Sequence, residues 1–254
     1  GPVLELRHNF DSHDRRGNYM AWDYSYNILQ SCEPDAIIFT NGDNDTFPLW
    51  YLQEVEDIRK DVSIVNLSLL NTDWYIKQLR DGSPAVSISL NDAQIENLSF
   101  SLWDERTLIY PVPAPVYNEL ISDVHENFGL QPVAADTTFS FLFRPTVNQP
   151  NGAAGIRVQD IMIEQIIREN RWRRPVYFAI TVSSQNKLGL DRNLRLDGLA
   201  LKLVPFPSNN IAVDDLADKL TEQFNYRGIN DPDVFHNKQK KDLLQNLRFA
   251  FINI

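Results

Sequence analysis

The chain has 254 residues, of which 43% are hydrophobic and 11% aromatic, and its formal net charge at pH 7 is −10. This length allows a packed core in one large domain or two modest ones, and the negative charge argues against a nucleic-acid partner, which needs clustered Lys and Arg. The single cysteine, Cys32, excludes an internal disulfide. No apolar run approaches the roughly 20 residues that span a bilayer, so the sequence predicts a soluble piece.

The segment 17–80 alternates between helical and strand patterns. Apolar side chains recur at helical spacing in 17–31, whereas AIIFT and VSIVNLSLL are nearly continuous apolar runs. Pro48 is expected in the first turn of the helix between those runs, where its missing N–H does no harm. In chain order the pattern predicts a helix over 17–31, a strand over 36–40, a helix from Asp45 or Thr46 to about 58, a strand over 62–70 and a helix over 74–80.

The rest of the chain is less uniform. Residues 81–150 contain many prolines and short alternating pieces such as AVSISL and FSFLF, which indicate an irregular or β-rich insertion. The later segments predict, in order, an amphipathic helix over 158–170, a strand over 176–182, a short helix or turn with a small strand within 196–205, a helix over 213–225 and a C-terminal helix over 238–252.

This succession of elements predicts an α/β fold. Apolar strands separated by helices indicate a parallel sheet that is covered on both faces. We therefore expect a single α/β domain over 1–254, with a mostly parallel, Rossmann-like sheet flanked by helices. The insertion at 81–150 and the C-terminal helix complete the expected domain.

Polar residues follow the predicted strands at the points where the strands end. In open α/β sheets, ligands bind in the crevice at the carboxyl ends of the strands. Three such ends are readable, at residues 41–46, 71–73 and 181–184. The sequence predicts a ligand-binding rim that consists of Asn41, Asp43, Asp45, Asn71 and Asp73.

Asp43 and Asp45 also form a D-x-D pattern, which has two interpretations. Two carboxylates separated by one residue can bind a hard divalent cation (Mg²⁺, Mn²⁺ or Ca²⁺), as in nucleotide-sugar glycosyltransferases, where the cation neutralises the diphosphate leaving group. Alternatively, the acidic residues cap the following helix and complement its dipole, while Gly42 supplies a positive φ. The same two readings, ligand or cap, apply to Asn71 and Asp73.

Other candidate residues are less informative. A polar run from His8 to Arg16 can bind a transition metal, reach an anionic ligand through Arg15 or Arg16, or serve as a solvated or capping lead-in to the first helix. Trp50 and Trp74 each lie a few residues after a candidate loop, so each is a candidate to stack on a sugar or to pack in the core. The sequence contains no G-x-S-x-G, P-loop or G-x-G-x-x-G motif.

Two long stretches carry a resemblance to a known family. They are NGDNDTFPLWYLQEVEDIRKDV and VNLSLLNTDWYIKQL, and they are supported by HDRRGNY, RRPVYFAITV, LDGLALKLVP and NDPDVF. With them the chain resembles the C-terminal soluble region of a membrane-protein family of Bacteroidetes. That family is grouped with transmembrane protein O-mannosyltransferase-like (GT-C) glycosyltransferases. The resemblance covers nearly the whole chain apart from 81–150.

The resemblance implies a parent protein in the inner membrane, with many transmembrane helices before this chain and with this domain in the periplasm. GT-C enzymes place their catalytic acid in a loop between early transmembrane helices, so the resemblance places the catalytic residue outside these 254 residues. It also makes a nucleotide-sugar role for Asp43 and Asp45 less fitting, because nucleotide sugars are not expected outside the membrane.

Three functions therefore stay open at this point. The main hypothesis is an accessory domain that holds a polypeptide or glycan acceptor for a membrane glycosyltransferase, with its own transmembrane domain as partner. The second is an independently active, metal-dependent transferase or hydrolase that uses Asp43 and Asp45. The third is a structural or interaction module whose polar rim only caps helices. Whether the fragment is itself an enzyme is left open.

Overall fold

The computed structural model describes residues 16–122, 130–150, 152–208, 213–231, 234–235 and 238–252, together with Glu5, Phe10 and Asp14. Most of the polar run from His8 to Arg16 lies outside these residues. The helices are α2 (Met20–Ser31), α3 (Asp43–Glu54), η1 (Leu69–Asn71), α4 (Asp73–Asp81), α5 (Asp92–Glu96), α6 (Ala114–Ser122), α7 (Val158–Asn170), η3 (Ser184–Asn186), η4 (Leu190–Asn193), α8 (Val213–Asp218), the π-helical η5 (Lys219–Gln223) and α9 (Lys238–Ile252).

The strands form one central sheet and two smaller ones. They are β1 (Ile37–Thr40), β2 (Ser63–Asn66), β3 (Ser101–Leu102), β4 (Arg106–Val112), β5 (Thr137–Phe143), β6 (Val147–Asn148), β7 (Ala154–Ile156), β8 (Val176–Ala179), β9 (Leu194–Asp197) and β10 (Ala200–Leu203). The central sheet has the order β2-β1-β8-β10-β9. The strand pairs β2–β1 and β1–β8 are parallel, whereas β8–β10 and β10–β9 are antiparallel.

The α/β class is confirmed, but the expectation of a mostly parallel sheet is wrong. The difference comes from 196–205, which form most of a β-hairpin instead of a short helix or turn with one strand. Gly198 makes the tight turn with φ +69°, and a Cβ on it would lie 2.2 Å from Ser31 Oγ, so only glycine fits there. Because two antiparallel pairs complete the sheet, the Rossmann-like description is not confirmed for the sheet as a whole.

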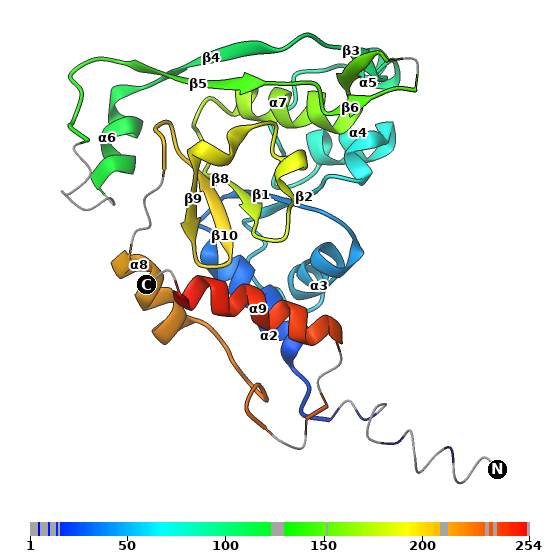
Figure 1. Ribbon diagram of the computed structural model, residues 1–254, viewed down its shortest axis with the longest axis vertical. Helices are drawn as coiled ribbons and strands as arrows, with labels where there is room; N and C mark the ends of the chain where they lie inside the picture. The colour runs from blue at the N-terminus through cyan, green and yellow to red at the C-terminus, as the bar shows by residue number, and fades with distance from the viewer. Residues whose placement is uncertain are drawn as a thin grey trace.

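Helices cover the central sheet on both faces (Figure 1). α2, α3 and α9 lie on one side, whereas α7 and α4 lie on the other, with the long β4–β5 ribbon beyond α7. Every residue of β1, β2 and β8 is buried, as a doubly covered parallel sheet requires. Ile37, Ile38 and Phe39 of β1 are fully buried at the centre of the core.

The chain reverses its winding direction at β1. It crosses from β1 through α3 to β2 on one side, and later returns through α7 to β8 on the other side of β1. The carboxyl ends of these three parallel strands therefore share one edge of the sheet, as predicted, and α3 and α7 begin at that edge. We call it the carboxyl edge and the opposite one the amino edge. Such a reversal is the usual place for a ligand in open α/β sheets.

Local differences from the predicted elements have physical causes. α3 begins at Asp43, so Pro48 is its sixth residue and lies beyond the first turn in which it was expected. β2 ends at Asn66 instead of near 70, because the Oδ1 of Asn66 accepts a hydrogen bond from Leu69 N (3.0 Å) and turns the chain into η1.

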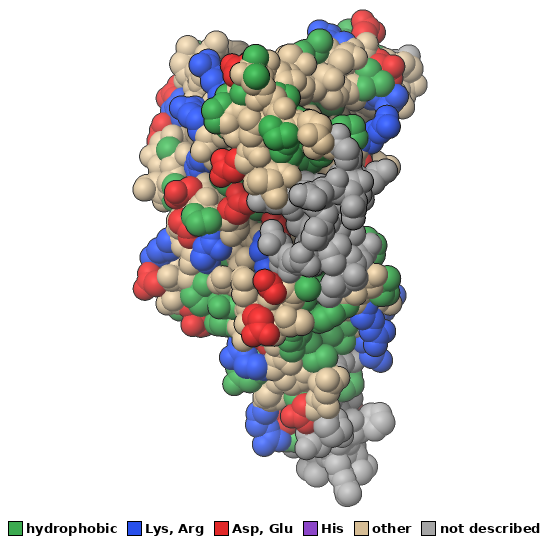
Figure 2. All heavy atoms as spheres, turned by 90° about the vertical axis from the view of Figure 1, so that its left-hand side faces the viewer, with side chains coloured by type: hydrophobic (Ala, Val, Ile, Leu, Met, Phe, Trp, Pro, Cys, Tyr) green, Lys and Arg blue, Asp and Glu red, His purple; other side chains and the backbone are tan. Residues whose placement is uncertain are grey.

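The described residues between 81 and 150 form strands and the short helices α5 and α6. β4 and β5 pair antiparallel along their whole length, and β3, β7 and β6 form a small antiparallel sheet. Phe139, Phe141 and Phe143 on β5 are buried and join the main core. Acidic, basic and apolar side chains are intermingled on the face of the molecule that Figure 2 presents. Among the described residues, no helix is both long enough and apolar enough to cross a bilayer.

Candidate functional site

A buried network of hydrogen bonds lies directly beneath the loops of the carboxyl edge. The hydroxyls of Thr40 and Thr46 lie 2.8 Å apart, and Thr46 Oγ1 donates to Gly42 O at 2.7 Å. Asn66 Nδ2 in turn donates to Thr46 Oγ1 at 2.8 Å. The two threonines and Asn66 are at most 2% exposed. The network joins the ends of β1 and β2 to the first turn of α3, so the loop that carries the predicted aspartates is held rigidly.

Asp45 bridges the point where the chain reverses its winding. Its Oδ2 accepts a hydrogen bond of 2.6 Å from Thr181 Oγ1, which follows β8. Burial raises the pKa of Asp45, and the hydrogen bond from Thr181 partly opposes that rise. The negative charge of Asp45 also adds to the raised pKa of Tyr24 on α2, for which burial is the larger cause. Asp45 is therefore a partly buried carboxylate that links the loops after β1 and β8.

The other two predicted residues of this loop are more open. Asp43 is exposed in the first turn of α3. Asn41 is half-buried, and its Oδ1 accepts a long hydrogen bond of 3.4 Å from Ser68 Oγ. Gly42 is the N-cap with φ +80°, as expected for a glycine at this turn, and makes no side-chain cap. Among the residues that the structure describes, no backbone N–H donates to either aspartate, and both lie in the first turn of α3, where a negative charge favours the helix dipole.

Asn71 caps a different helix from the one that the sequence suggested. α4 has no side-chain cap from Thr72, its N-cap residue. Instead, Asn71 Oδ1 accepts from Gln159 N at 3.1 Å in the first turn of α7, and Asn71 Nδ2 donates to Gln159 Oε1 at 2.9 Å. The expectation that Asn71 caps its own following helix is wrong, because the fold brings the start of α7 beside η1.

The contact between Asn71 and Gln159 continues toward the end of β8. Gln159 Nε2 and Arg157 Nη2 both donate to Asn186 Oδ1, at 3.3 and 2.9 Å. We call Asn71, Gln159, Asn186 and Arg157 the amide cluster. It connects the ends of β2 and β8 through the N-terminus of α7. Sequence reasoning missed Arg157, Gln159 and Asn186, since the separation between Asn71 and Gln159 along the chain gives no local signal.

Arg157 is held by a second pair of bonds. Its Nε and Nη2 each donate to Asp160 at 2.9 Å, and its backbone N–H also donates to Asp160 Oδ2 at 2.8 Å. The Asp160 carboxylate is fully buried and accepts a further hydrogen bond from the Thr146 hydroxyl. The bond from the Arg157 backbone N–H to Asp160 is one half of a capping box, and the R-x-x-D spacing at the start of α7 was its one sequence signal.

Asp73 stands apart from both groups. It is exposed at the start of α4, and its Oδ1 accepts from the neighbouring Trp74 N at 2.8 Å. No described contact joins it to Asp45 or to the amide cluster. The predicted rim is thus present as two polar groups on one edge, Asp45 with Thr181 and the amide cluster, while the binding roles of its five residues stay predictions.

A cation at Asp43 and Asp45 also stays a prediction. Among the described residues, no group of three or more His, Cys, Asp or Glu side chains is placed to hold a metal ion. Two carboxylates, one of them already hydrogen-bonded to Thr181, are the donors that this turn offers. Hard cations take six or more oxygen ligands, so water or a ligand would have to supply the others.

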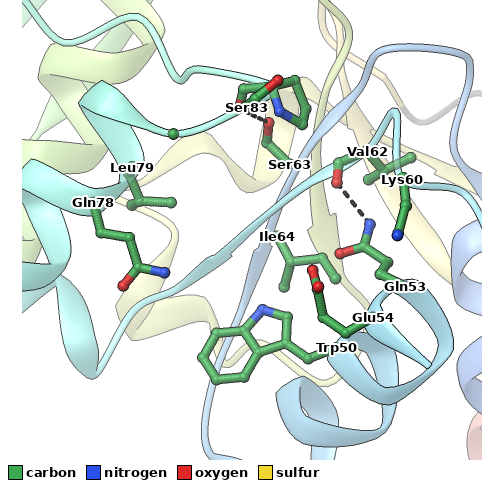
Figure 3. Close-up of a pocket in the computed structure, with 12 residues that line it drawn as sticks. Trp50, Gln53, Glu54, Lys60, Val62, Ser63, Ile64, Gln78, Leu79 and Ser83 are labelled. Atoms are coloured by element: carbon green, nitrogen blue, oxygen red, sulfur yellow. Dashed lines mark hydrogen bonds between the residues drawn. The ribbon is translucent and has the colours of Figure 1, made fainter. Parts of the chain in front are cut away.

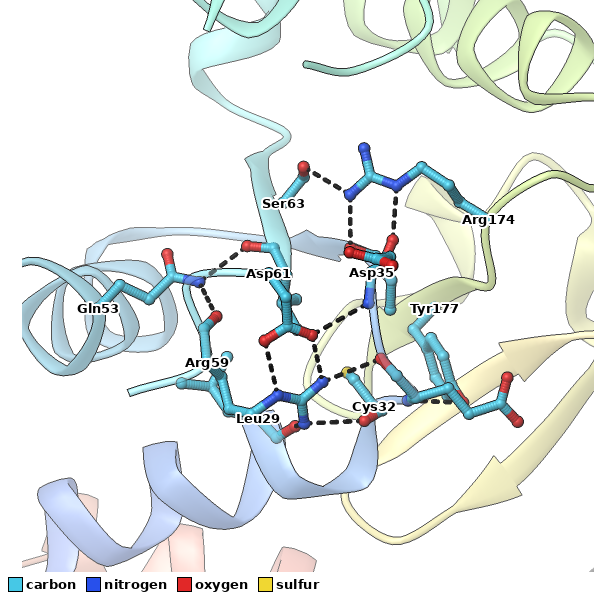
Figure 4. Close-up of polar contacts among 12 residues, drawn as sticks. Leu29, Cys32, Asp35, Gln53, Arg59, Asp61, Ser63, Arg174 and Tyr177 are labelled. Carbon is cyan, nitrogen blue, oxygen red and sulfur yellow. Dashed lines mark hydrogen bonds and ion pairs between the residues drawn. The ribbon is translucent and has the colours of Figure 1, made fainter. Parts of the chain in front are cut away.

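The amino edge of the same strands is built from two arginines (Figure 4). Arg59 donates to Leu29 O (2.6 Å) and Cys32 O (2.9 Å) at the end of α2, and its Nη2 also reaches Glu33 O and Asp61. Arg59 thereby lowers the pKa of Asp61. Arg59 thus bonds to the Leu29 carbonyl in the last turn of α2, which also accepts from Cys32 N, and to the two carbonyls that follow the helix.

Arg174, which precedes β8, makes a similar set of bonds at the same edge. It donates to the carbonyls of Asp35 (2.5 Å), Ala36 (3.1 Å) and Ala85 (2.8 Å), and to Ser63 Oγ (2.8 Å). Its position before β8 lets it reach the segments that enter β1 and β2. The donors of both arginines are turned inward onto the protein's own backbone.

These features define an α/β domain whose amino edge is closed by bonds from two arginines and whose carboxyl edge carries polar side chains. Residues 21–126 and 145–220 match the family described as TMEM260-associated domain 2, and the chain belongs to that family.

Two relatives are named as enzymes. The "Protein O-mannosyl-transferase TMEM260" of Mus musculus is 33% identical over 84 residues, which cover 33% of this chain and 12% of that protein. The "Protein O-mannosyl-transferase tmem260" of Dictyostelium discoideum is 24% identical over 71 residues, which cover 28% of this chain and 9% of that protein. The chain thus matches only a small part of each relative, and no solved structure matches it. The resemblance to O-mannosyltransferase-like proteins is confirmed.

Proposed function

We propose that this chain is an extracytoplasmic domain of a membrane glycosyltransferase, and that it holds the acceptor, a polypeptide or a glycan, while the transfer takes place elsewhere in the parent protein. Family membership and the names of the two relatives support the link to glycosyl transfer. The matched residues are 12% and 9% of those relatives, which leaves most of their length for a separate catalytic part.

The observation that carries the proposal is the meeting of the loops after β1, β2 and β8 at the carboxyl edge. Asp45 and Thr181 join two of them at 2.6 Å. The amide cluster joins the end of β2 to the end of β8 through Asn71 and Asn186. Amide and hydroxyl groups offer both donors and acceptors, which suit the peptide groups and hydroxyls of an acceptor. Because these side chains hold one another, they are oriented before a ligand arrives.

The chemistry of the same groups favours binding over catalysis. Amide side chains do not exchange protons in the ordinary pH range, so Asn71, Gln159 and Asn186 cannot serve as general acids or bases. Arg157 is the one ionisable residue of the amide cluster, and it is paired with Asp160 in a salt bridge. Positioning an acceptor against a reactive donor can still contribute greatly to the rate, since it removes the entropy cost of bringing the two together.

The proposal is tested on the parent protein in its membrane, with Asp45→Asn and Asn71→Ala as variants. Each variant should raise the KM for the acceptor severalfold and leave kcat nearly unchanged, because an interaction made equally in the ground and transition states is lost. Asp104→Asn is a matched control, since Asp104 is an exposed aspartate on another part of the surface. An unchanged KM in both variants would refute acceptor binding at this edge. A collapse of kcat with unchanged KM would instead favour chemistry by Asp45.

A further inference from the structure

A second site lies along the outer edge of β2, away from the carboxyl edge. A cavity of about 330 Å³ opens between α3 and α4, which is at the lower end of the roughly 300–1,000 Å³ of small-molecule sites. Figure 3 shows β2 passing between Trp50, Gln53 and Glu54 of α3 on one side and Gln78 and Leu79 of α4 on the other. The cavity lies beside the amino-terminal half of the strand, where Ser63 and Ile64 line it.

β2 is an edge strand, so half of its peptide groups point into this space. Ser63 N donates to Ala36 O (2.8 Å) and Leu67 N donates to Thr40 O (2.9 Å), which turns Ser63 and Leu67 toward β1. In a parallel ladder the alternate residues then face away from the neighbour. Ile64 therefore presents its peptide N–H and C=O at the open edge.

Side chains occupy most of the hydrogen-bonding groups on that edge. Tyr75 Oη donates to Ile64 O at 3.2 Å and accepts from Asn66 N at 2.9 Å. Gln53 Nε2 donates to Val62 O at 2.8 Å. Among the described residues, no acceptor is bonded to the Ile64 N–H. An added β-strand needs a row of free peptide groups, so a single free donor does not support strand addition but does suit a small ligand.

The groups around the Ile64 N–H are mixed in character and carry little free positive charge. Lys60 is bound to Asp57 at 2.5 Å, and the carboxylate of Glu54 lines the same space. An anionic ligand would meet an uncompensated like charge there. A purely apolar ligand would bury the Ile64 N–H and the Gln78 amide without partners, which is unfavourable. The cavity thus fits a neutral ligand with several hydroxyls.

Trp50 supplies the aromatic surface that such a ligand needs. The ring stacks on Phe47 at 5.6 Å and lies 6.4 Å from Tyr75, so its position is fixed by neighbours on α3 and α4. It is half-buried and forms part of the cavity wall. Its indole N–H has no acceptor among the described residues and is available as a second donor. Trp74, the other tryptophan considered for a sugar, is 54% exposed and does not line this cavity.

We propose that this cavity binds the ring of one neutral hexose, with Trp50 as the apolar platform, the Ile64 N–H as a donor to a ring hydroxyl, and Glu54 and Gln78 as further partners. The proposal does not depend on acceptor binding at the carboxyl edge, because the two sites share no residue. The outer edge of β2 thus gains a sugar-binding role, while Tyr75 and Gln53 occupy its other outward peptide groups.

The test is an NMR titration of the full 254-residue chain with methyl α-mannoside, glucose and galactose. At least one sugar should shift the Trp50 indole and Ile64 amide resonances saturably, with a Kd on the order of 1–10 mM, as expected for a single small ligand. Gln78→Ala should weaken this binding at least threefold, and Trp50→Phe should weaken it further by removing the N–H while keeping an aromatic ring. Gln223→Ala is the matched control, since Gln223 is an exposed glutamine on η5, and it should bind as the unmodified chain does.

Two outcomes overturn the proposal. No saturable shift of the Trp50 and Ile64 resonances at 50 mM of any of the three sugars (about five times the weakest expected Kd) refutes a hexose site. Shifts confined to Asp45, Asn71 and Gln159 also refute it, although they would support ligand binding at the carboxyl edge. A short extended peptide that shifts Ile64 more strongly than any sugar would likewise contradict it.

Discussion

The two edges of the strands β1, β2 and β8 use polar side chains in opposite ways. At the amino edge, Arg59 and Arg174 turn their donors inward onto backbone carbonyls and Asp61. At the carboxyl edge, Asp43 is open to solvent and Asp45 is only partly buried. The amino edge is therefore closed by its own bonds, whereas the carboxyl edge keeps polar groups that a ligand can reach.

Helix orientation explains why the edges differ in charge. α2 ends at the amino edge, and its last carbonyls attract the Arg59 cation. α3 begins at the carboxyl edge, where Asp43 and Asp45 lie in the first turn and favour its positive dipole end. Both arrangements are electrostatically favourable. The edges also differ in exposure, since the Arg59 side chain is 19% exposed whereas Asp43 is open to solvent.

Arg59→Ala should have the largest effect on stability and tests whether the amino edge has a structural role. The change removes the side-chain donor of the Leu29, Cys32 and Glu33 carbonyls and the charged partner of Asp61, so we expect a loss of about 3 kcal/mol in the free energy of unfolding. Urea denaturation at pH 7 measures it. A loss below about 0.5 kcal/mol, the size of an ordinary surface change, would contradict a structural role for this edge.

The same variant has a predicted pH dependence. Arg59 is the main cause of the lowered pKa of Asp61. A lowered folded-state pKa contributes stability above the unfolded value of about 3.9 and loses it as pH falls through the folded value. The stability difference between the unmodified chain and Arg59→Ala should therefore shrink below about pH 4. A difference that stays constant from pH 7 to pH 3 would show that the ion pair adds nothing to the carbonyl bonds.

Asn66→Ala should have the next largest effect on stability, and it tests the hydrogen-bond network at the carboxyl edge. Asn66 is 2% exposed and bonds to Thr46 Oγ1 and Leu69 N, so the change removes one bond from the buried Thr46 hydroxyl and leaves Leu69 N without its side-chain acceptor. We expect a loss of about 2 kcal/mol in the free energy of unfolding. Thermal denaturation monitored by circular dichroism measures it. A variant as stable as the unmodified chain would mean that the floor of the carboxyl edge is not built from this network.

Asp45→Asn should not destabilise the protein at pH 7. Asparagine can still accept the hydrogen bond from Thr181, and the change removes a carboxylate whose pKa burial raises. A raised folded-state pKa means that the unmodified chain loses stability as pH rises from the unfolded value, about 3.9, through the folded one. The variant lacks this loss, so its relative stability should increase between pH 4 and pH 7. If the denaturation midpoint of the variant instead decreases relative to that of the unmodified chain between pH 4 and pH 7, the burial of Asp45 is contradicted.

Asp43→Asn should have the smallest effect on stability, within about 0.5 kcal/mol, because the side chain is exposed. The variant decides the cation proposal instead. If Asp43 and Asp45 bind Mg²⁺, Mn²⁺ or Ca²⁺, calorimetric titration of the unmodified chain gives a saturable heat that Asp43→Asn abolishes. Absence of heat with all three cations would remove the metal-dependent enzyme from consideration.

The sequence was most informative where periodicity is strong and local. The apolar run of β1 and the amphipathic helices α7 and α9 lie where the pattern predicted them. The hairpin β9–β10 was missed, although Asp197-Gly198 between two apolar pieces is a local turn signal and Gly198 takes φ +69° at the turn. That one hairpin decided between a mostly parallel sheet and a mixed one.

The candidate site divides in the same way. Its location followed from the rule that strand ends share an edge, and Asn41, Asp43 and Asp45 lie there. The partners of Asn71 could not be predicted, because Gln159 and Asn186 reach it only through the packing of α7 beside η1. Trp50 illustrates a further limit, since the sequence suggested a sugar platform but gave no means of finding the cavity beside β2.

The central claim is that the acceptor contacts the carboxyl edge and not the amino edge. A photoreactive amino acid placed in the parent protein at Asp43 or, as a control, at Ala85 tests it directly, since both positions are exposed and Ala85 lies beside Arg174 at the amino edge. We predict that the acceptor is crosslinked from position 43 and not from position 85. Crosslinking from position 85 alone, or equally from both positions, would contradict the account.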